Sequence, residues 1–215
     1  MVTVKRKRWM LKMEQANIEH DAHSDLHMTP EQEYGISKLG MWLFLGTEIM
    51  LFGGLFAAYA IFRAKYPEMF LESHQELNRE MGAVNTCILI FSSLTMAIGV
   101  TAIQRGKQML AGIMILVTII CGLGFGVVKY FEYGAKFAHH IYTDTNIFFS
   151  LYFMMTGLHM LHVFIGLVVL GVIMVLTFKG KFGEKYSTPV ELGGLYWHLV
   201  DLVWIYLFPL LYLVG

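Results

Sequence analysis

Five long apolar stretches constrain this chain more than any other feature of its sequence. They cover residues of about 39–62, 83–103, 108–130, 147–177 and 192–214. A helix needs about 20 mostly apolar residues to cross the roughly 30 Å hydrocarbon core of a bilayer, and each stretch is long enough. Only 15% of the residues are charged, against about 25% in soluble domains. The sequence therefore predicts an all-α membrane protein with five transmembrane helices in a bundle.

The distribution of basic residues predicts how this bundle is oriented. Five spans place the two termini on opposite sides of the membrane. Most of the Lys and Arg residues lie in the N-terminal segment and in the loops on its side, and a minority lies on the other side. The positive-inside bias then places the N-terminus in the cytoplasm, or in the topologically equivalent matrix, and the C-terminus outside.

The polar N-terminus divides the chain into a cytoplasmic segment, residues 1–38, and a membrane domain, residues 39–215. We expect no cleavable signal peptide, because the first basic residues are followed by a long polar stretch instead of an apolar core. The segment contains His20, His23 and His27, whose spacing suits one face of a metal-binding helix. The alternative is a solvated arm that has no core to preorganise ligands, and we favour this interpretation.

Charge and small residues exclude several other functions. The net charge is zero, so the chain has no general basic field for nucleic acid. Cys87 and Cys121 lie inside apolar runs, which favours small buried side chains over a disulfide or zinc site. Gly122, Gly124 and Gly126 superficially resemble a nucleotide-binding loop, but they lie in a continuous apolar span. We therefore expect them to allow close helix packing.

Ionisable residues inside the spans are the candidate functional residues, because each costs at least about 2.5 to 3.5 kcal/mol at a helix centre. Glu48 lies about ten residues into the first span. It is either a carboxylic acid that holds a proton or an ion, or a protonated group that forms a hydrogen bond between helices. Lys129 and Glu132 are three residues apart near the outer end of the third span. They either pair with each other or extend to the membrane interface.

Histidines and carboxylates also share faces of the last two spans. His159 and His162 are three residues apart, as are His198 and Asp201, and Glu191 precedes His198 by one to two turns. Di-metal carboxylate bundles use Glu-x-x-His pairs on two helices, and this chain has neither pair. We interpret these residues as a buried polar cluster that forms hydrogen bonds between helices or contacts lipid head groups, without a metal.

No part of the sequence outside the membrane indicates catalysis. It has no Ser-His-Asp arrangement, no phosphate-binding loop and no redox pair of cysteines. We therefore predict no catalytic site on this chain.

The last two spans also carry a family resemblance. The fourth contains Thr156-Gly157-Leu158-His159-Met160-Leu161-His162, and the fifth contains Glu191 followed by Tyr196-Trp197-His198-Leu199-Val200-Asp201. Together with Glu48, Asn85-Thr86 and Glu132-Tyr133, these motifs resemble subunit III of haem-copper respiratory oxidases, the cytochrome c oxidase subunit 3 family, over about residues 38–214. The chain resembles the shorter, five-span form that is common in bacteria.

The resemblance implies an accessory, non-redox subunit of a proton-pumping terminal oxidase in aerobic respiration. It implies that this chain packs beside subunit I in the bacterial cytoplasmic (inner) membrane, binds phospholipid, and supports proton uptake and complex integrity. Haem and copper would belong to subunits I and II, with no cofactor on this chain. A small subunit IV and other respiratory complexes are further partners that the resemblance suggests.

The resemblance also implies roles for single residues. Glu48 matches the intramembrane carboxylate of the family. A structural, metal-free polar cluster of the family is matched by Glu132, His159, His162, Glu191, His198 and Asp201. Lys129 is a departure, because several family members carry Gln at this position.

Two other functions remain open on the sequence. One is a subunit III homologue that accompanies a nitric oxide reductase. The other is an independent ion or proton transporter that uses Glu48 and the histidines. Transporters of this kind often have inverted repeats and broken spans. This sequence has no visible repeat, and its spans contain an internal Pro only near the end of the fifth, at Pro209.

Overall fold

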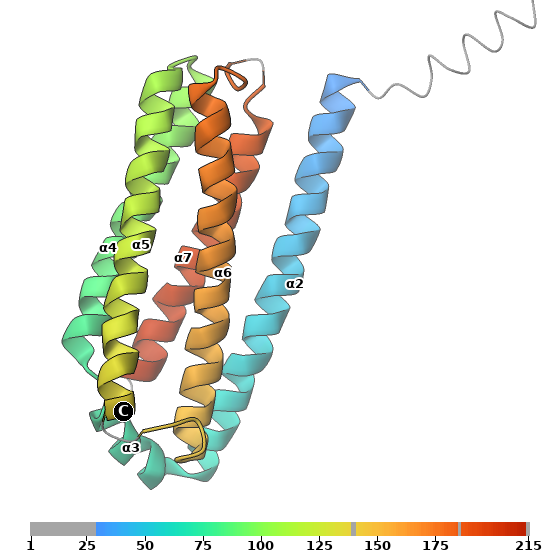
Figure 1. Ribbon diagram of the computed structural model, residues 1–215. Helices are drawn as coiled ribbons and strands as arrows, with labels where there is room; N and C mark the ends of the chain where they lie inside the picture. Colours follow the sequence, from blue (N-terminus) through green and yellow to red (C-terminus); the bar gives the residue numbers. More distant parts are fainter. Residues whose placement is uncertain (1–28, 139–140, 185, 214–215) are drawn as a thin grey trace, which may run out of the picture. The chain divides into compact units, whose positions relative to one another are not determined.

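The computed structural model describes residues 29–138, 141–184 and 186–213, and most of these residues are helical. The helices are α2 (Pro30–Lys65), α3 (Pro67–Gln75), α4 (Arg79–Gln104), α5 (Gln108–Ala138), α6 (Ile147–Phe178), α7 (Thr188–Phe208) and the π-helical segment η1 (Pro209–Leu213) (Figure 1). Five helices, namely α2, α4, α5, α6 and α7 with η1, are long and apolar enough to cross a membrane. This confirms the five predicted spans.

The observed helices extend beyond the predicted spans because polar residues continue them past the apolar stretches. α2 begins at Pro30, inside the predicted polar segment, and α5 continues to Ala138. The start of α2 has a capping box, in which the Thr29 N–H donates to Gln32 Oε1 (2.9 Å) and the Gln32 N–H donates to Thr29 Oγ1 (3.3 Å). The short helix α3 was not predicted; it begins with Pro67 in its first turn, where the missing N–H costs little.

The chain divides into two units between Leu43 and Phe44. The second unit contains a ring of four helices, in which α4 contacts α5, α5 contacts α6, α6 contacts α7 and α7 contacts α4 (Figure 1). Gly106 follows α4 and Gly180 follows α6, and they adopt φ values of 72° and 71°, a conformation that glycine tolerates best.

From Phe44 onward, α2 packs on the ring through one stripe of side chains. Leu45, Phe52 and Tyr59 are buried and lie seven residues apart, which is the repeat of one helix face. The ring of Phe52 lies 5.3 Å from the imidazole of His162 on α6, edge to face. This stripe places Glu48, one turn before Phe52, against the same helix.

A buried tryptophan of α7 packs against α5 and α6. Trp197 of α7 has no exposed surface, and it fits between α5 and α6 because both have a glycine there. A Cβ atom added at Gly122 would lie 2.7 Å from Trp197, and one at Gly166 would lie 3.0 Å from it. The predicted close packing is therefore confirmed at Gly122, but a Cβ at Gly124 or Gly126 would meet nothing within 4 Å.

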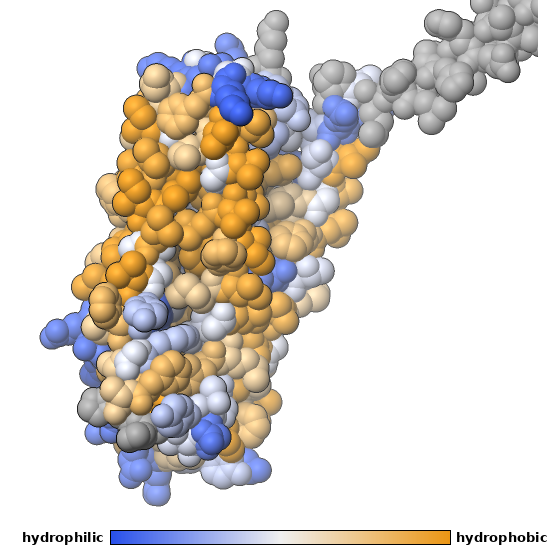
Figure 2. All heavy atoms as spheres, viewed as in Figure 1, coloured by the Kyte–Doolittle hydropathy of each residue, from blue (hydrophilic) through white to orange (hydrophobic). Residues whose placement is uncertain are grey.

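The outward faces of α5 and α6 are apolar along most of their length. Figure 2 shows hydrophobic residues over these helices and hydrophilic residues gathered at their ends. The exposed apolar side chains include Leu123, Val127, Phe131, Phe164 and Val168. Such a surface is stable in lipid or against another apolar surface.

The prediction that both cysteines are buried was wrong. Cys87 is exposed on α4, and Cys121 is half-buried.

Candidate functional site

Glu48 of α2 is paired with His162 of α6. Its Oε2 lies 2.8 Å from His162 Nε2, and the two side chains are 14% and 11% exposed. His162 Nδ1 lies 2.8 Å from the carbonyl oxygen of Leu158. Because a carbonyl can only accept, Nδ1 carries a hydrogen. Nε2 and the Glu48 carboxyl group therefore share a single proton, held either by the imidazole or by the carboxyl group.

The surroundings fix the orientation of this pair. The Tyr196 hydroxyl of α7 donates to the carbonyl oxygen of His162 (3.1 Å), and Phe52 covers the imidazole. Of the two interpretations of Glu48, the structure has the geometry of the hydrogen bond between helices. The sequence placed Glu48 and His162 on different spans but had no signal for their contact.

Lys129 and Glu132 of α5 form a second buried pair. Lys129 Nζ lies 2.8 Å from Glu132 Oε2, and each side chain is 2% exposed. The other carboxylate oxygen, Oε1, accepts hydrogen bonds from the hydroxyls of Tyr152 on α6 (2.8 Å) and Tyr212 on η1 (2.5 Å). Lys129 thus pairs with Glu132 instead of extending to the interface.

Aromatic rings complete the surroundings of the Lys129 ammonium group. Nζ donates to the Tyr212 hydroxyl (2.8 Å) and lies 4.7 Å from the centroid of Trp204, within range of a cation–π interaction. A buried charge is tolerated only when it is paired and hydrogen-bonded. Here one lysine and two tyrosines satisfy the Glu132 carboxylate and join α5, α6 and η1.

Hydroxyl groups of α4 line its seam with α7. Ser93 Oγ lies 2.7 Å from His198 Nδ1. The indole N–H of Trp197 donates to Ser92 Oγ (3.0 Å). These two hydrogen bonds join α4 to α7. Asp201 is 1% exposed, and among the described residues its carboxylate oxygens have no hydrogen-bond partner.

His159 and Glu191 have different surroundings. His159 is 1% exposed and packs between the rings of Phe125 and Trp204, with centroids 5.5 and 5.3 Å away. Glu191 accepts from Ser187 Oγ (2.6 Å) and from Gln104 Nε2 (2.9 Å). Glu191 and Tyr212 are about 30 Å apart along the last span. Because Tyr212 binds Glu132, Glu191 lies far from Glu132.

The residues predicted as one polar cluster have different partners. Glu132 binds Lys129, His162 binds Glu48, and His198 lies against Ser93. Spacing along one helix indicates a shared face, but it does not indicate which neighbour that face meets.

A further contact, for which the sequence has no signal, holds the end of the bundle. His74 of α3 is buried. Its Nε2 accepts from Arg79 Nη2 (2.9 Å), since a guanidinium can only donate. Its Nδ1 lies 3.1 Å from the carbonyl oxygen of Leu211 in η1. The last carbonyls of a helix lack partners within the helix, and His74 provides one.

In the described ranges, no three His, Cys, Asp or Glu side chains come together in a way that could hold a metal ion. The tail histidines His20, His23 and His27 lie outside the described residues.

The fold and these contacts define a class of protein: a helical integral membrane protein with two pairs of ionisable side chains between its helices. The family model "Cytochrome c oxidase subunit III" matches residues 6–215. The chain is 37% identical over 180 residues to cytochrome c oxidase subunit 3 of Thermostichus vulcanus, covering 82% of this chain and 86% of the relative. It is 32% identical over 206 residues to quinol oxidase subunit 3 of Bacillus subtilis, covering 92% and 98%.

A third relative joins two subunits in one polypeptide. Heme-copper oxidase subunit I+III of Aeropyrum pernix is 29% identical over 183 residues, which cover 82% of this chain and 22% of that protein. From the family model and the two preceding relatives, the chain belongs to the cytochrome c oxidase subunit III family. It is accordingly an integral membrane subunit of a terminal oxidase, which is an oxidoreductase complex.

Proposed function

We propose that this chain is an accessory, non-redox subunit of a proton-pumping haem-copper oxidase in aerobic respiration. It packs beside subunit I and carries no catalytic site of its own. Haem and copper belong to subunits I and II, and the complex lies in the bacterial cytoplasmic membrane, with the N-terminus of this chain inside. A small subunit IV is a further partner.

One observation carries the proposed position beside subunit I. In the Aeropyrum pernix relative, whose name is subunit I+III, the part that resembles this chain occupies only 22% of the polypeptide. Joining two subunits in one chain requires that their ends lie within reach of each other in the assembly. The apolar outward faces of α5 and α6 (Figure 2) suit contact with lipid or with a partner helix.

The proposed support of proton uptake depends on Glu48. The Glu48 carboxyl group and His162 Nε2 share one proton over 2.8 Å, and both side chains retain some exposure. A group that can hold and release a proton inside a span suits a role in proton supply. In this assignment Glu48 supports proton delivery to subunit I, where dioxygen is reduced.

Purification through a tag on this chain tests the proposal. In mild detergent, we expect haem-bearing and copper-bearing subunits to accompany the chain, and an optical spectrum with metal analysis measures both metals. After dissociation, we expect the isolated chain to retain neither. Metal that stayed on the isolated chain would contradict the accessory role. Partners that reduced nitric oxide instead of dioxygen would assign the chain to a different reductase.

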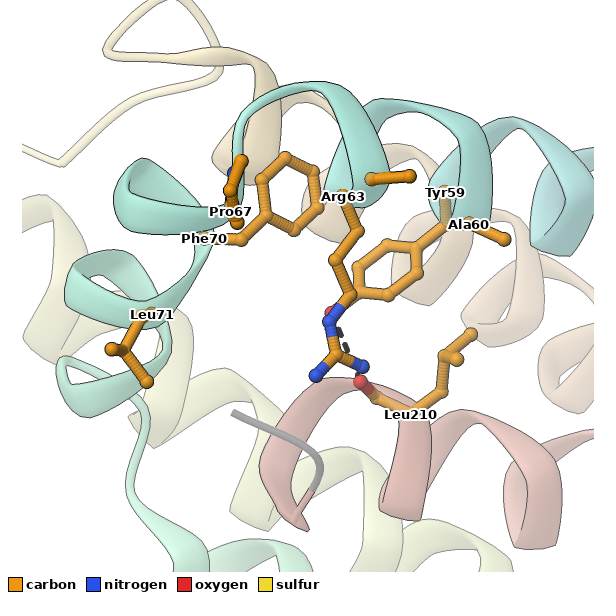
Figure 3. A pocket seen from close by; sticks show the side chains of 8 residues that line it. Tyr59, Ala60, Arg63, Pro67, Phe70, Leu71 and Leu210 are labelled. Atoms are coloured by element: carbon orange, nitrogen blue, oxygen red, sulfur yellow. Dashed lines mark hydrogen bonds between the residues drawn. The ribbon is translucent and has the colours of Figure 1, made fainter.

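Binding of phospholipid is the last part of the proposed function. The chain belongs to an integral membrane family, and two of its pockets are lined mostly by apolar residues. The pocket at the end of α2 also contains the charged side chain of Arg63 (Figure 3).

A further inference from the structure

Small residues form one face of α2 that the rest of the second unit leaves open. We call this the small face of α2, and its members are Gly46, Gly53, Ala57, Ala60 and Ala64. With 3.6 residues per turn they lie within about 60° of each other round the helix axis, and about a third of a turn from the stripe that packs on the ring. All but Gly46 are exposed. A Cβ atom added at Gly46 or Gly53 would meet nothing within 4 Å.

The small face is nearly as long as a membrane span. From Gly46 to Ala64 the helix rises about 27 Å, close to the roughly 30 Å of the hydrocarbon core of a bilayer. Small residues let two helix backbones approach closely, and helix interfaces in membranes are enriched in them. Acyl chains bend to cover any apolar surface, so lipid alone does not require five small residues at helical spacing. The small face therefore suits a second transmembrane helix that lies alongside α2.

Arg63 adds a charge at one end of this face. It is half-buried, and it lines a pocket of about 510 Å³ together with Ala60 and Ala64. Figure 3 shows its side chain extending beside the ring of Tyr59 towards Leu210. Within the described ranges, Arg63 forms no ion pair and no hydrogen bond. A guanidinium can donate two N–H groups at once to a carboxylate, so this end of the face is complementary to an acidic side chain.

The position of Arg63 fixes where that acidic side chain lies on the partner. Arg63 directly follows the apolar run that ends near residue 62, and α3 begins in the next turn, at Pro67. A carboxylate in contact with Arg63 is therefore at the end of the partner's span. An ionisable group costs less there than at the centre of a span, because it can reach the membrane interface.

We propose that the small face of α2 binds a transmembrane helix of another subunit, and that a carboxylate at the end of that helix pairs with Arg63. Apolar side chains of the partner lie against Gly53 and Ala57. The inference rests on the proposed function only for the existence of a partner subunit. It adds which face of this chain the partner covers and which charge the partner carries. It leaves the apolar pocket between α5 and α6 to lipid.

A pair of glycine variants in the tagged complex tests the packing. Gly53→Leu fills the small face, whereas Gly54→Leu adds the same side chain about 100° further round the helix. A Cβ at either position meets nothing within 4 Å in this chain, so both variants should fold. We expect Gly53→Leu to speed the loss of one subunit in detergent about tenfold, as overpacking of a helix contact does. Gly54→Leu should leave the rate unchanged, and equal rates for the two variants would overturn the proposal.

Removal of the charge tests the ion pair. Arg63→Gln should speed the loss of the same subunit about tenfold, the effect of one charge-assisted hydrogen bond. Lys65→Gln is the matched control, because Lys65 is two residues away, at the same helix end, and is absent from the pocket lining. Mass spectrometry of the retained subunits measures both rates. Equal rates for Arg63→Gln and Lys65→Gln would contradict the pairing.

A third variant identifies the partner. Arg63→Lys keeps the charge and places an amine in the pocket. A carbodiimide joins this amine to a carboxylate in contact with it through an amide bond, and the carbodiimide takes up the released water as a urea. Mass spectrometry of the digested complex should then find a peptide of this chain joined to an Asp or Glu at the end of a span of another subunit. The wild-type complex, treated in the same way, should lack this product. A product within this chain alone, or no product, would overturn the proposal.

Two other outcomes are distinguishable in the same samples. If Gly53→Leu and Arg63→Gln retained every subunit and only lowered the count of bound lipid, lipid would cover the small face, which contradicts the proposal. The haem that accompanies each variant reports on the proposed function separately. A joined partner without any haem-bearing subunit would contradict the proposed function and leave the docking face in place.

Discussion

Two pairs of ionisable residues lie between the helices of the membrane domain. Glu48 binds His162, and Lys129 binds Glu132, each over 2.8 Å. The two pairs differ in exposure and in partners. The pair of Glu48 and His162 retains some exposure, whereas Tyr152 and Tyr212 enclose the carboxylate of Glu132. The first pair therefore suits exchange of a proton, and the second suits a permanent structural bond.

Replacement of Glu48 tests the first pair. We expect Glu48→Ala to leave the haem content of the complex normal, because the proposed function assigns the haems to other subunits. Proton uptake or turnover lifetime should change, because the shared proton is lost. Proton uptake during turnover and the optical spectrum measure the two effects. Thr47→Ala, an adjacent change on α2, is the control. Normal proton uptake and turnover lifetime in Glu48→Ala would contradict the role of Glu48.

Replacement of Lys129 tests the second pair. Lys129→Met should destabilise the folded chain by about 3–5 kcal/mol, because it leaves the Glu132 carboxylate buried without a cation. Lys129→Met combined with Glu132→Gln should recover much of this loss, since neither charge then remains. Unfolding in detergent measures both, and Lys181→Met, at an exposed lysine, is the control. A double variant as unstable as the single one would show that the charge balance does not matter.

Helix packing depends on where each glycine lies relative to Trp197. In α5, Gly122 faces this side chain and Gly124 does not. Residues on one helix that look alike in sequence thus differ in what they contact. The same holds for the hydroxyls of α4, where Ser92 and Ser93 meet different residues of α7.

A pair of alanine variants tests this packing. Gly122→Ala should destabilise the bundle by about 1–3 kcal/mol, because the new Cβ would lie 2.7 Å from Trp197 and 2.8 Å from Leu167. Gly124→Ala is the matched control, and it should be neutral or slightly stabilising, since alanine favours the helix and its Cβ meets nothing within 4 Å. Thermal unfolding in detergent compares them. Equal stability of the two variants would contradict the packing at Trp197.

Contacts between distant segments close the membrane domain at the end where α3 lies. His74 of α3 and Tyr59 of α2 bind the carbonyls of Leu211 and Leu210 in η1. These contacts join residues that are 137 and 151 positions apart in the chain. The C-terminal segment is therefore held by helices that precede it by most of the sequence.

Loss of His74 should loosen this end of the molecule. We expect His74→Phe to increase hydrogen exchange in residues 209–213, because the carbonyl of Leu211 loses its donor and Arg79 loses its acceptor. Glu72→Gln, at an exposed position of α3, should leave the exchange unchanged. Hydrogen exchange followed by mass spectrometry measures both. Unchanged protection of residues 209–213 in His74→Phe would mean that η1 is held by other contacts.

The sequence by itself determined the five spans, because the length of an apolar stretch and the thickness of a bilayer decide them without reference to other segments. The motifs of the last two spans also indicated the family. Tertiary structure alone decided which side chains meet. It placed Glu48 against His162, and it gave Glu132 and Glu191 different partners. These depend on which helices are neighbours and how each is rotated, and side-chain spacing within one helix contains no information about either.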